Sequence, residues 1–134
     1  MNNQKKKESR LLRIEIIKLL YQYDFYENNL PFLSQESEIV SNVFHKIIAK
    51  LKLIDNIIIK NLYNYKINRL NKVDKAIIRL ATFELLEKDV PYAIVIDEAV
   101  ELTKKFCNLN DEKQHKFNNK LLDKINKELQ ITSN

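Results

Sequence analysis

Lysine and arginine side chains gather at the start of the chain, where the chemistry they could perform is the binding of a polyanion. Residues 1 to 20 carry six basic and two acidic side chains, so they hold +4 of the net charge of +5. The basic residues are Lys5, Lys6, Lys7, Arg10, Arg13 and Lys18. Local positive charge favours nucleic acid as a partner. More often, however, such a lysine cluster is simply a solvent-exposed surface without a ligand. Nucleic-acid binding and a solvated surface therefore both remain open.

The spacing of these cations indicates a helix with one basic side. Apolar residues recur at three- and four-residue intervals from about residue 6 to 27, which predicts an amphipathic helix. Lys6, Arg10 and Arg13 fall at i, i+4 and i+7 on another side of it. Cations are disfavoured near the positive end of a helix dipole. A bound anion would offset this cost, so the basic side is consistent with anion binding.

The chain contains no glycine, and this argues against several classes of enzyme. Phosphate-cradling loops, dinucleotide fingerprints and nucleophile elbows need glycine for tight turns and close approach of the backbone to the ligand. A single cysteine forms no internal disulfide, and His45 and His115 lack a zinc-type spacing. We predict that Cys107 is a small buried residue and that the histidines are ordinary surface or packing residues. We therefore expect no catalytic residue, cofactor or metal ion.

The middle of the chain predicts two further helices. Ser34 is placed to cap a helix with an apolar stripe over residues 39–51. The apolar pattern continues, after a bend near Asp55, as a third helix to about residue 65. Residues 64–70 are the expected junction between two halves of the fold.

The fourth helix should be the central element. Asn71 can cap its start, with Asp74 as the acidic partner of a capping box. The helix is apolar over so wide an arc that it must have neighbours on several sides. Arg79 stands inside this apolar row, and we expect it to reach a carboxylate such as Glu84 or Glu98.

The end of the chain completes an all-α fold. Pro91 suits the first turn of a fifth helix, and a last helix follows a polar loop at residues 108–114. We predict six to seven helices in two small three-helix bundles packed together. Residues 1–134 would form a single domain, with bundles at about 5–65 and about 71–130. Because no apolar run is long enough to cross a bilayer, we expect no membrane contact and a cytoplasmic location.

The ordered motifs of the chain resemble those of the NusB family of bacterial transcription antitermination factors. The family's valine, acidic and basic residues followed by Ala-Ile-Leu-Arg correspond to residues 73–79. Its Lys-Phe-Val-Asn-Gly motif corresponds to residues 116–120, with Asn118 in place of the valine. Further matching segments are residues 20–22, 83–85 and 89–104. Together these motifs cover nearly the whole chain in the right order.

The resemblance implies a non-enzymatic protein of two three-helix bundles. It would bind boxA-type RNA of ribosomal RNA operons together with the ribosomal protein NusE, and so help RNA polymerase in the elongation complex to read through terminators. By the same resemblance, the residues facing single-stranded RNA are Lys5, Lys6, Lys7, Arg10, Arg13, Lys116, Phe117, Asn119 and Lys120. The face toward NusE would include Tyr21 and Asp74.

Phe117 has two interpretations. An exposed ring beside Lys116 could stack on RNA bases, and Tyr63 and Tyr65 could extend that surface. Without the resemblance, Phe117 is better interpreted as the first core residue of the last helix.

Several departures from the family pattern leave other functions open. Ser9 and Leu11 stand where some members have arginine, and Cys107 and Lys120 stand where glycine is common. Lysine does not replace the bidentate contacts of arginine. The alternative function is a helical protein-interaction module with only generic RNA affinity. A third possible function, a NusB-like domain of an RNA methyltransferase, ranks below these two. The chain could also form a homodimer that buries the basic surface.

Overall fold

The computed structural model describes residues 3–26, 37–63, 66–107 and 112–132, and within these ranges the chain is helical with no strand. The elements are α1 (Asn3–Phe25), α2 (Glu38–Ala49), α3 (Leu51–Asn61), the short 3₁₀ helix η1 (Ile67–Arg69), α4 (Lys72–Glu87), α5 (Tyr92–Phe106) and α6 (Lys113–Thr132). The prediction of an all-α protein with six to seven helices is confirmed. None of these helices is long and apolar enough to span a membrane.

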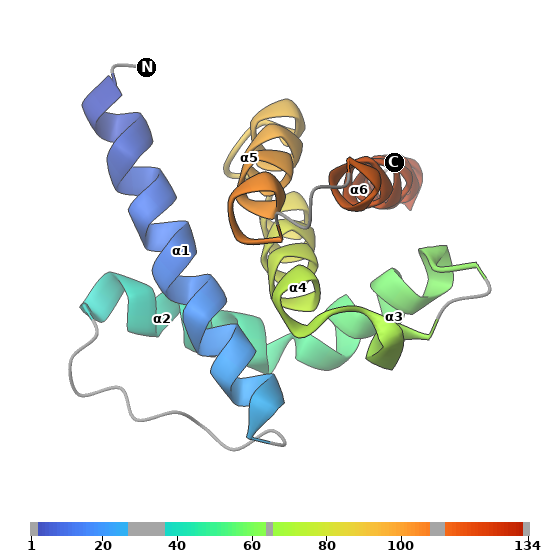
Figure 1. The fold of residues 1–134 in the computed structure, drawn as a ribbon, viewed down its shortest axis with the longest axis horizontal. Coiled ribbons are helices and arrows are strands. Elements are labelled where there is room, and N and C mark those ends of the chain that lie inside the picture. The colour runs from blue at the N-terminus through green and yellow to red at the C-terminus, as the bar shows by residue number, and fades with distance from the viewer. Residues whose placement is uncertain (1–2, 27–36, 64–65, 108–111, 133–134) are drawn as a thin grey trace.

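The central element is α4, as its sequence indicates. Eleven of its sixteen residues are buried, and it contacts α1, α3, α5 and α6 (Figure 1). Buried apolar side chains from all six α-helices join in one continuous core. The division into bundles at about 5–65 and about 71–130 therefore stays a prediction.

Local signals account for where the helices begin and end. The Asn71 side chain accepts a hydrogen bond from the Val73 backbone N–H at 2.8 Å and caps α4 as predicted. Ser37 caps α2 in the same way, whereas the predicted cap Ser34 lies outside the described residues. The break between α2 and α3 falls at Lys50 rather than near Asp55.

Arg79 joins α4 to α3, and the predicted partners for it were wrong. Its guanidinium donates two hydrogen bonds to Asp55, at 2.9 and 2.8 Å, and lies 3.9 Å from a carboxylate oxygen of Asp24. Neither Glu84 nor Glu98 is available to it, because arginines of α1 occupy both carboxylates.

Candidate nucleic-acid interface

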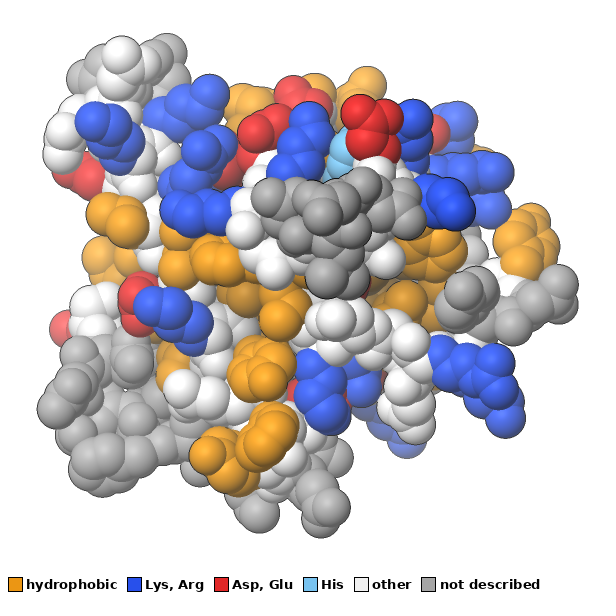
Figure 2. Space-filling view, viewed as in Figure 1, with side chains coloured by type: hydrophobic (Ala, Val, Ile, Leu, Met, Phe, Trp, Pro, Cys, Tyr) orange, Lys and Arg blue, Asp and Glu red, His pale blue; other side chains and the backbone are white. Residues whose placement is uncertain are grey.

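The predicted basic side of α1 begins with three exposed lysines. Lys5, Lys6 and Lys7 are all exposed, and the first turn of α1 has no acidic residue. Figure 2 shows many Lys and Arg side chains along the upper edge of the molecule, with Asp and Glu side chains among them. Lysine charges at the positive end of a helix dipole are unfavourable when no anion is bound. The same charges attract an anionic ligand to this end of α1.

Arg10 forms an ion pair with α5. Its Nε and Nη2 atoms both donate to the Glu98 carboxylate at 3.0 Å. The hydrogen bond to Glu98 raises the pKa of Arg10 above its ordinary value, although burial opposes that rise. The Arg10 side chain is 35% exposed, so it is only partly shielded from solvent.

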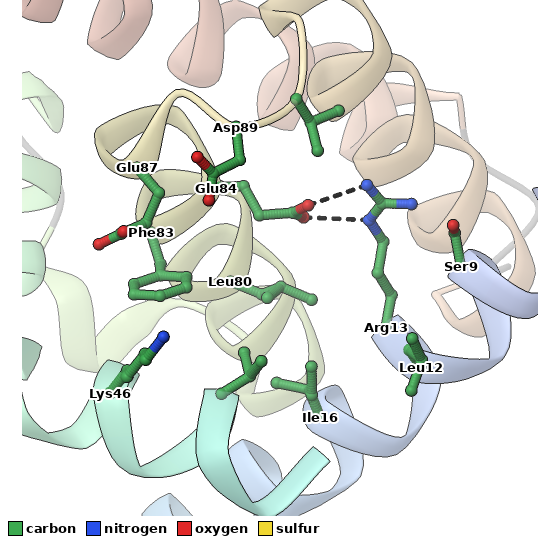
Figure 3. A pocket seen from close by; sticks show the side chains of 12 residues that line it. Ser9, Leu12, Arg13, Ile16, Lys46, Leu80, Phe83, Glu84, Glu87 and Asp89 are labelled. Carbon is green, nitrogen blue, oxygen red and sulfur yellow. Dashed lines mark hydrogen bonds and ion pairs between the residues drawn. The ribbon is translucent and has the colours of Figure 1, made fainter. Parts of the chain in front are cut away.

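Arg13, one turn further along α1, is held more tightly. It donates to both carboxylate oxygens of Glu84 on α4, at 3.0 and 2.8 Å, and its side chain is only 11% exposed. Figure 3 shows this pair in the wall of a hollow of about 270 Å³ with apolar side chains such as Leu12, Leu80 and Phe83. Bidentate pairs of this kind fix geometry. Arg13 therefore ties α1 to α4 and offers little surface to a ligand.

The start of α6 carries the second set of predicted RNA residues. Lys116, Asn119 and Lys120 are exposed, and Phe117 is half-buried against the core. Lys116 lies 3.2 Å from Glu112, with both side chains more than two-thirds exposed, at 69% and 79%. An exposed pair of this kind contributes little to stability, so Lys116 can exchange this partner for a phosphate at small cost.

Phe117 lines a hollow, and only some of the residues around this hollow were predicted from the sequence to bind RNA. The hollow measures about 330 Å³ and is lined by Asn61, Leu62, Tyr63, Phe117, Lys120, Leu121 and Lys124. Tyr63 is 77% exposed, and the Lys124 Nζ atom lies 4.3 Å from its ring centroid. Sequence reasoning missed Lys124, although it follows Lys120 by one helical turn. Tyr65 lies outside the described residues.

Helix α5 lies between the two sets of cations. Figure 1 shows it between the start of α1 and α6. Its last turn adds Lys104 and Lys105, both exposed, and Phe106, which is 40% exposed. Sequence reasoning did not identify these three residues as part of a site, although they form a basic and aromatic cluster. A strand of RNA that contacts both sets of cations would run past α5.

Asp74 does not lie at the surface. It is 2% exposed, and its Oδ1 atom accepts hydrogen bonds from Cys107 Sγ at 3.1 Å and from Asn118 Nδ2 at 3.0 Å. Asp74 thus faces the interior, and its contact with a protein partner stays a prediction. Burial, followed by the Asp74 carboxylate, raises the pKa of Cys107 to about 12. Cys107 is thus the small buried residue that we predicted, and not a nucleophile.

Tyr21, the other predicted partner contact, belongs to an aromatic row at the end of α1. Its ring is half-buried and stacks on Phe25 with 6.0 Å between centroids, and Phe25 meets Tyr26 edge-on at 5.1 Å. Phe25 and Tyr26 are 54% and 57% exposed. This row leaves apolar aromatic surface open to solvent.

Comparison with known proteins decides the family. The model of the NusB family matches residues 2–127, which is nearly the whole chain. The chain belongs to the NusB family. Its membership places it among transcription antitermination factors, which are not enzymes, in agreement with the prediction. In the part of the chain that the structure describes, no group of three or more His, Cys, Asp or Glu could hold a metal ion.

Individual NusB relatives align over almost their full length. The chain is 36% identical to the transcription antitermination protein NusB of Thermotoga sp. (strain RQ2), over 89% of this chain and 90% of the relative. It is 34% identical to that of Buchnera aphidicola subsp. Cinara cedri, over 90% and 89%.

Two solved structures share the fold. NusB of T. maritima superposes with a TM-score of 0.73 at 33% identity, covering 89% of this chain and 90% of that one. A chain from the crystal structure of a plectonemic RNA supercoil superposes with a TM-score of 0.77 at 26% identity, covering 94% and 98%.

Proposed function

We propose that this NusB-family protein binds single-stranded boxA-type RNA of ribosomal RNA operons together with the ribosomal protein NusE, and thereby promotes read-through by RNA polymerase in the cytoplasm. The observation that carries the proposal is the pair of exposed basic segments, one at the start of α1 and one at the start of α6, on a chain of this family. Polyanion binding needs such charge.

The RNA backbone contacts belong to the exposed cations. Lys5, Lys6 and Lys7 on α1, with Lys116 and Lys120 on α6, neutralise phosphates. Arg10 adds a contact through its partly exposed side chain. Arg13 acts indirectly, because its ion pair with Glu84 holds α1 in place.

The bases are bound around the hollow at the end of α3. The exposed Tyr63 ring and the half-buried Phe117 ring supply stacking surface, and Lys124 lies over the face of Tyr63. Asn119 is exposed on α6 outside the residues that line the hollow, and it offers both donor and acceptor groups to base edges or ribose hydroxyls further along the strand. Aromatic stacking of this kind contributes about 1–3 kcal/mol per base.

The protein partner NusE contacts the other end of α1. Tyr21, Phe25 and Tyr26 form an exposed aromatic row there, and aromatic side chains are enriched in the centres of protein interfaces. This surface lies at the opposite end of α1 from the lysines (Figure 1), so RNA and protein can bind at the same time.

A titration tests the proposal. Fluorescently labelled boxA RNA and a scrambled strand of equal length are titrated with the full chain, with and without NusE, at several salt concentrations. We expect tighter binding to boxA, affinity that falls steeply with salt, and a further gain with NusE. Equal binding to both strands would support a protein-interaction module with generic RNA affinity instead.

A further inference from the structure

Three helix ends meet at one buried carboxylate oxygen beside the proposed RNA site. Asn118 of α6 is completely buried, and its Nδ2 atom donates to Asp74 Oδ1 and to Thr103 Oγ1, both at 3.0 Å. Its Oδ1 atom accepts from Gln114 Nε2 at 3.1 Å. Asp74 stands in the first turn of α4 and Thr103 in the last turns of α5. Nearly all the hydrogen-bonding groups of Asn118 are therefore used inside the protein.

Asp74 Oδ1 also accepts a hydrogen bond from Cys107, which lies before the connection between α5 and α6. Cys107, the C-cap of α5, donates its S–H to Asp74 Oδ1 at 3.1 Å. Asp74 thus holds the chain on both sides of residues 108–111, at Cys107 and at Asn118. The carboxylate lies near the positive end of the α4 dipole, which stabilises its charge.

Two departures from the family motif meet in this cluster. Asn118 stands where the NusB motif has valine, and Cys107 stands where glycine is common. Neither valine nor glycine could donate a side-chain hydrogen bond to Asp74. In this chain, the side chains of Asn118 and Cys107 supply these hydrogen bonds.

We propose that Asn118 is a positioning residue for RNA binding, which anchors the first turns of α6 to Asp74 so that Lys116, Asn119 and Lys120 are held toward the RNA. This inference rests on the proposed function. Leu122 and Ile125, both fully buried, determine which side of α6 faces the core. Apolar contacts have no preferred direction, whereas hydrogen bonds fix a position along the helix axis as well.

The substitution Asn118→Leu removes the anchor and keeps the number and branching of the side-chain heavy atoms. We expect several-fold weaker binding to boxA RNA and a shallower dependence on salt, by about 0.7 in the log–log slope for each phosphate that the variant no longer neutralises. The matched control is Asn126→Leu, the same change at another buried position of α6, 7% exposed and two turns further from the site. The inference is overturned if both variants bind with the same affinity and slope.

A double-mutant cycle separates positioning from general stability. In a Lys116→Gln, Lys120→Gln background, Asn118→Leu should decrease RNA affinity much less than it does in the wild type, because two of the three side chains that it positions are already replaced. An equal decrease in affinity in both backgrounds contradicts a positioning role. If Asn118→Leu does not fold, Thr103→Val removes one of the same hydrogen bonds and replaces it in the cycle, with the same expected outcome.

The wild-type titration distinguishes the proposed function from the role of Asn118. A wild-type chain that does not prefer boxA RNA contradicts the proposed function itself. A wild-type chain that prefers boxA RNA, while Asn118→Leu retains its affinity and slope, contradicts only the role of Asn118.

Discussion

Arg13 on α1 and Glu84 on α4, 71 residues apart in the sequence, form a bidentate ion pair with N···O distances of 3.0 and 2.8 Å. The side chains are 11% and 17% exposed, so the pair is largely shielded from solvent. Arg13, which the resemblance to the NusB family predicts to bind RNA, thus joins α1 to α4. We therefore propose the exposed lysines before it as the main phosphate contacts of α1.

Removing Arg13 should therefore reduce stability more than RNA binding. Arg13→Met leaves the Glu84 carboxylate without its partner, and we expect the free energy of unfolding in urea to fall by about 1–3 kcal/mol. Glu84→Gln made in the Arg13→Met background should cost less than it does alone, because the two residues act as a pair. A folded Arg13→Met chain with wild-type stability but a shallower salt slope for RNA would show that Arg13 contacts the RNA after all.

Replacing the exposed lysines should have the opposite effect. For Lys6→Gln with Lys7→Gln we expect the free energy of unfolding to stay within about 0.5 kcal/mol of wild type. The log–log slope of RNA affinity against salt should become shallower by up to about 1.4, for two phosphate contacts to a single strand. Lys52→Gln, an exposed lysine on α3, serves as the control and should leave the slope unchanged. A slope that changes equally in both variants would assign the effect to net charge alone.

The Tyr63 ring should contribute to RNA affinity by stacking. Tyr63→Ala is expected to weaken boxA binding by about 1–3 kcal/mol, which is roughly 5- to 150-fold, whereas Tyr63→Phe keeps the ring and most of the affinity. Tyr92→Ala removes another exposed ring, 52% exposed against 77% for Tyr63, at the start of α5 and should have little effect. Fluorescence titration measures the RNA affinity of all three variants. If Tyr63→Ala binds RNA as tightly as the wild type, the proposal that bases bind at the hollow between α3 and α6 is wrong.

Acid should weaken the fold through Asp24. Burial raises the pKa of this carboxyl, but hydrogen bonds from Lys75 and Lys72 outweigh it, and the pKa of Asp24 lies below its ordinary value of 3.8. A lowered folded-state pKa contributes stability above the ordinary value, and this contribution is lost as pH falls through the folded-state pKa. Urea unfolding of Asp24→Asn should show lower stability at neutral pH and a weaker loss below about pH 4. An unchanged acid dependence would contradict this role for Asp24.

Helix positions and the central place of α4 could be predicted because they depend on local patterns. The wide apolar arc of α4 predicts neighbours on several sides, and four helices contact it. The Asn71 side chain caps α4 by accepting a hydrogen bond from the Val73 backbone N–H. The exposed lysines of α1 follow from the same periodicity. These features require only the spacing of residue types along one element.

The partners of charged residues could not be predicted, because they depend on how helices distant in sequence approach each other. Arg10 and Glu98 lie 88 residues apart, and Arg79 pairs with Asp55 rather than with Glu84 or Glu98. Asp74 has the position of a capping residue, yet it faces the core where three helix ends meet. Periodicity identifies the side of a helix, but it does not identify the side chain that the next helix brings to it.

The most direct test of the proposed RNA site is to map where the RNA lies. BoxA RNA carrying 4-thiouridine is photo-crosslinked to the full chain in the presence of NusE, and the crosslinked peptides are identified by mass spectrometry. We predict crosslinks both to the start of α1, around Lys5 to Lys7, and to the surface of Tyr63, Phe117 and Lys124. Crosslinks confined to α2, or to the Tyr21–Phe25–Tyr26 row, would contradict this site.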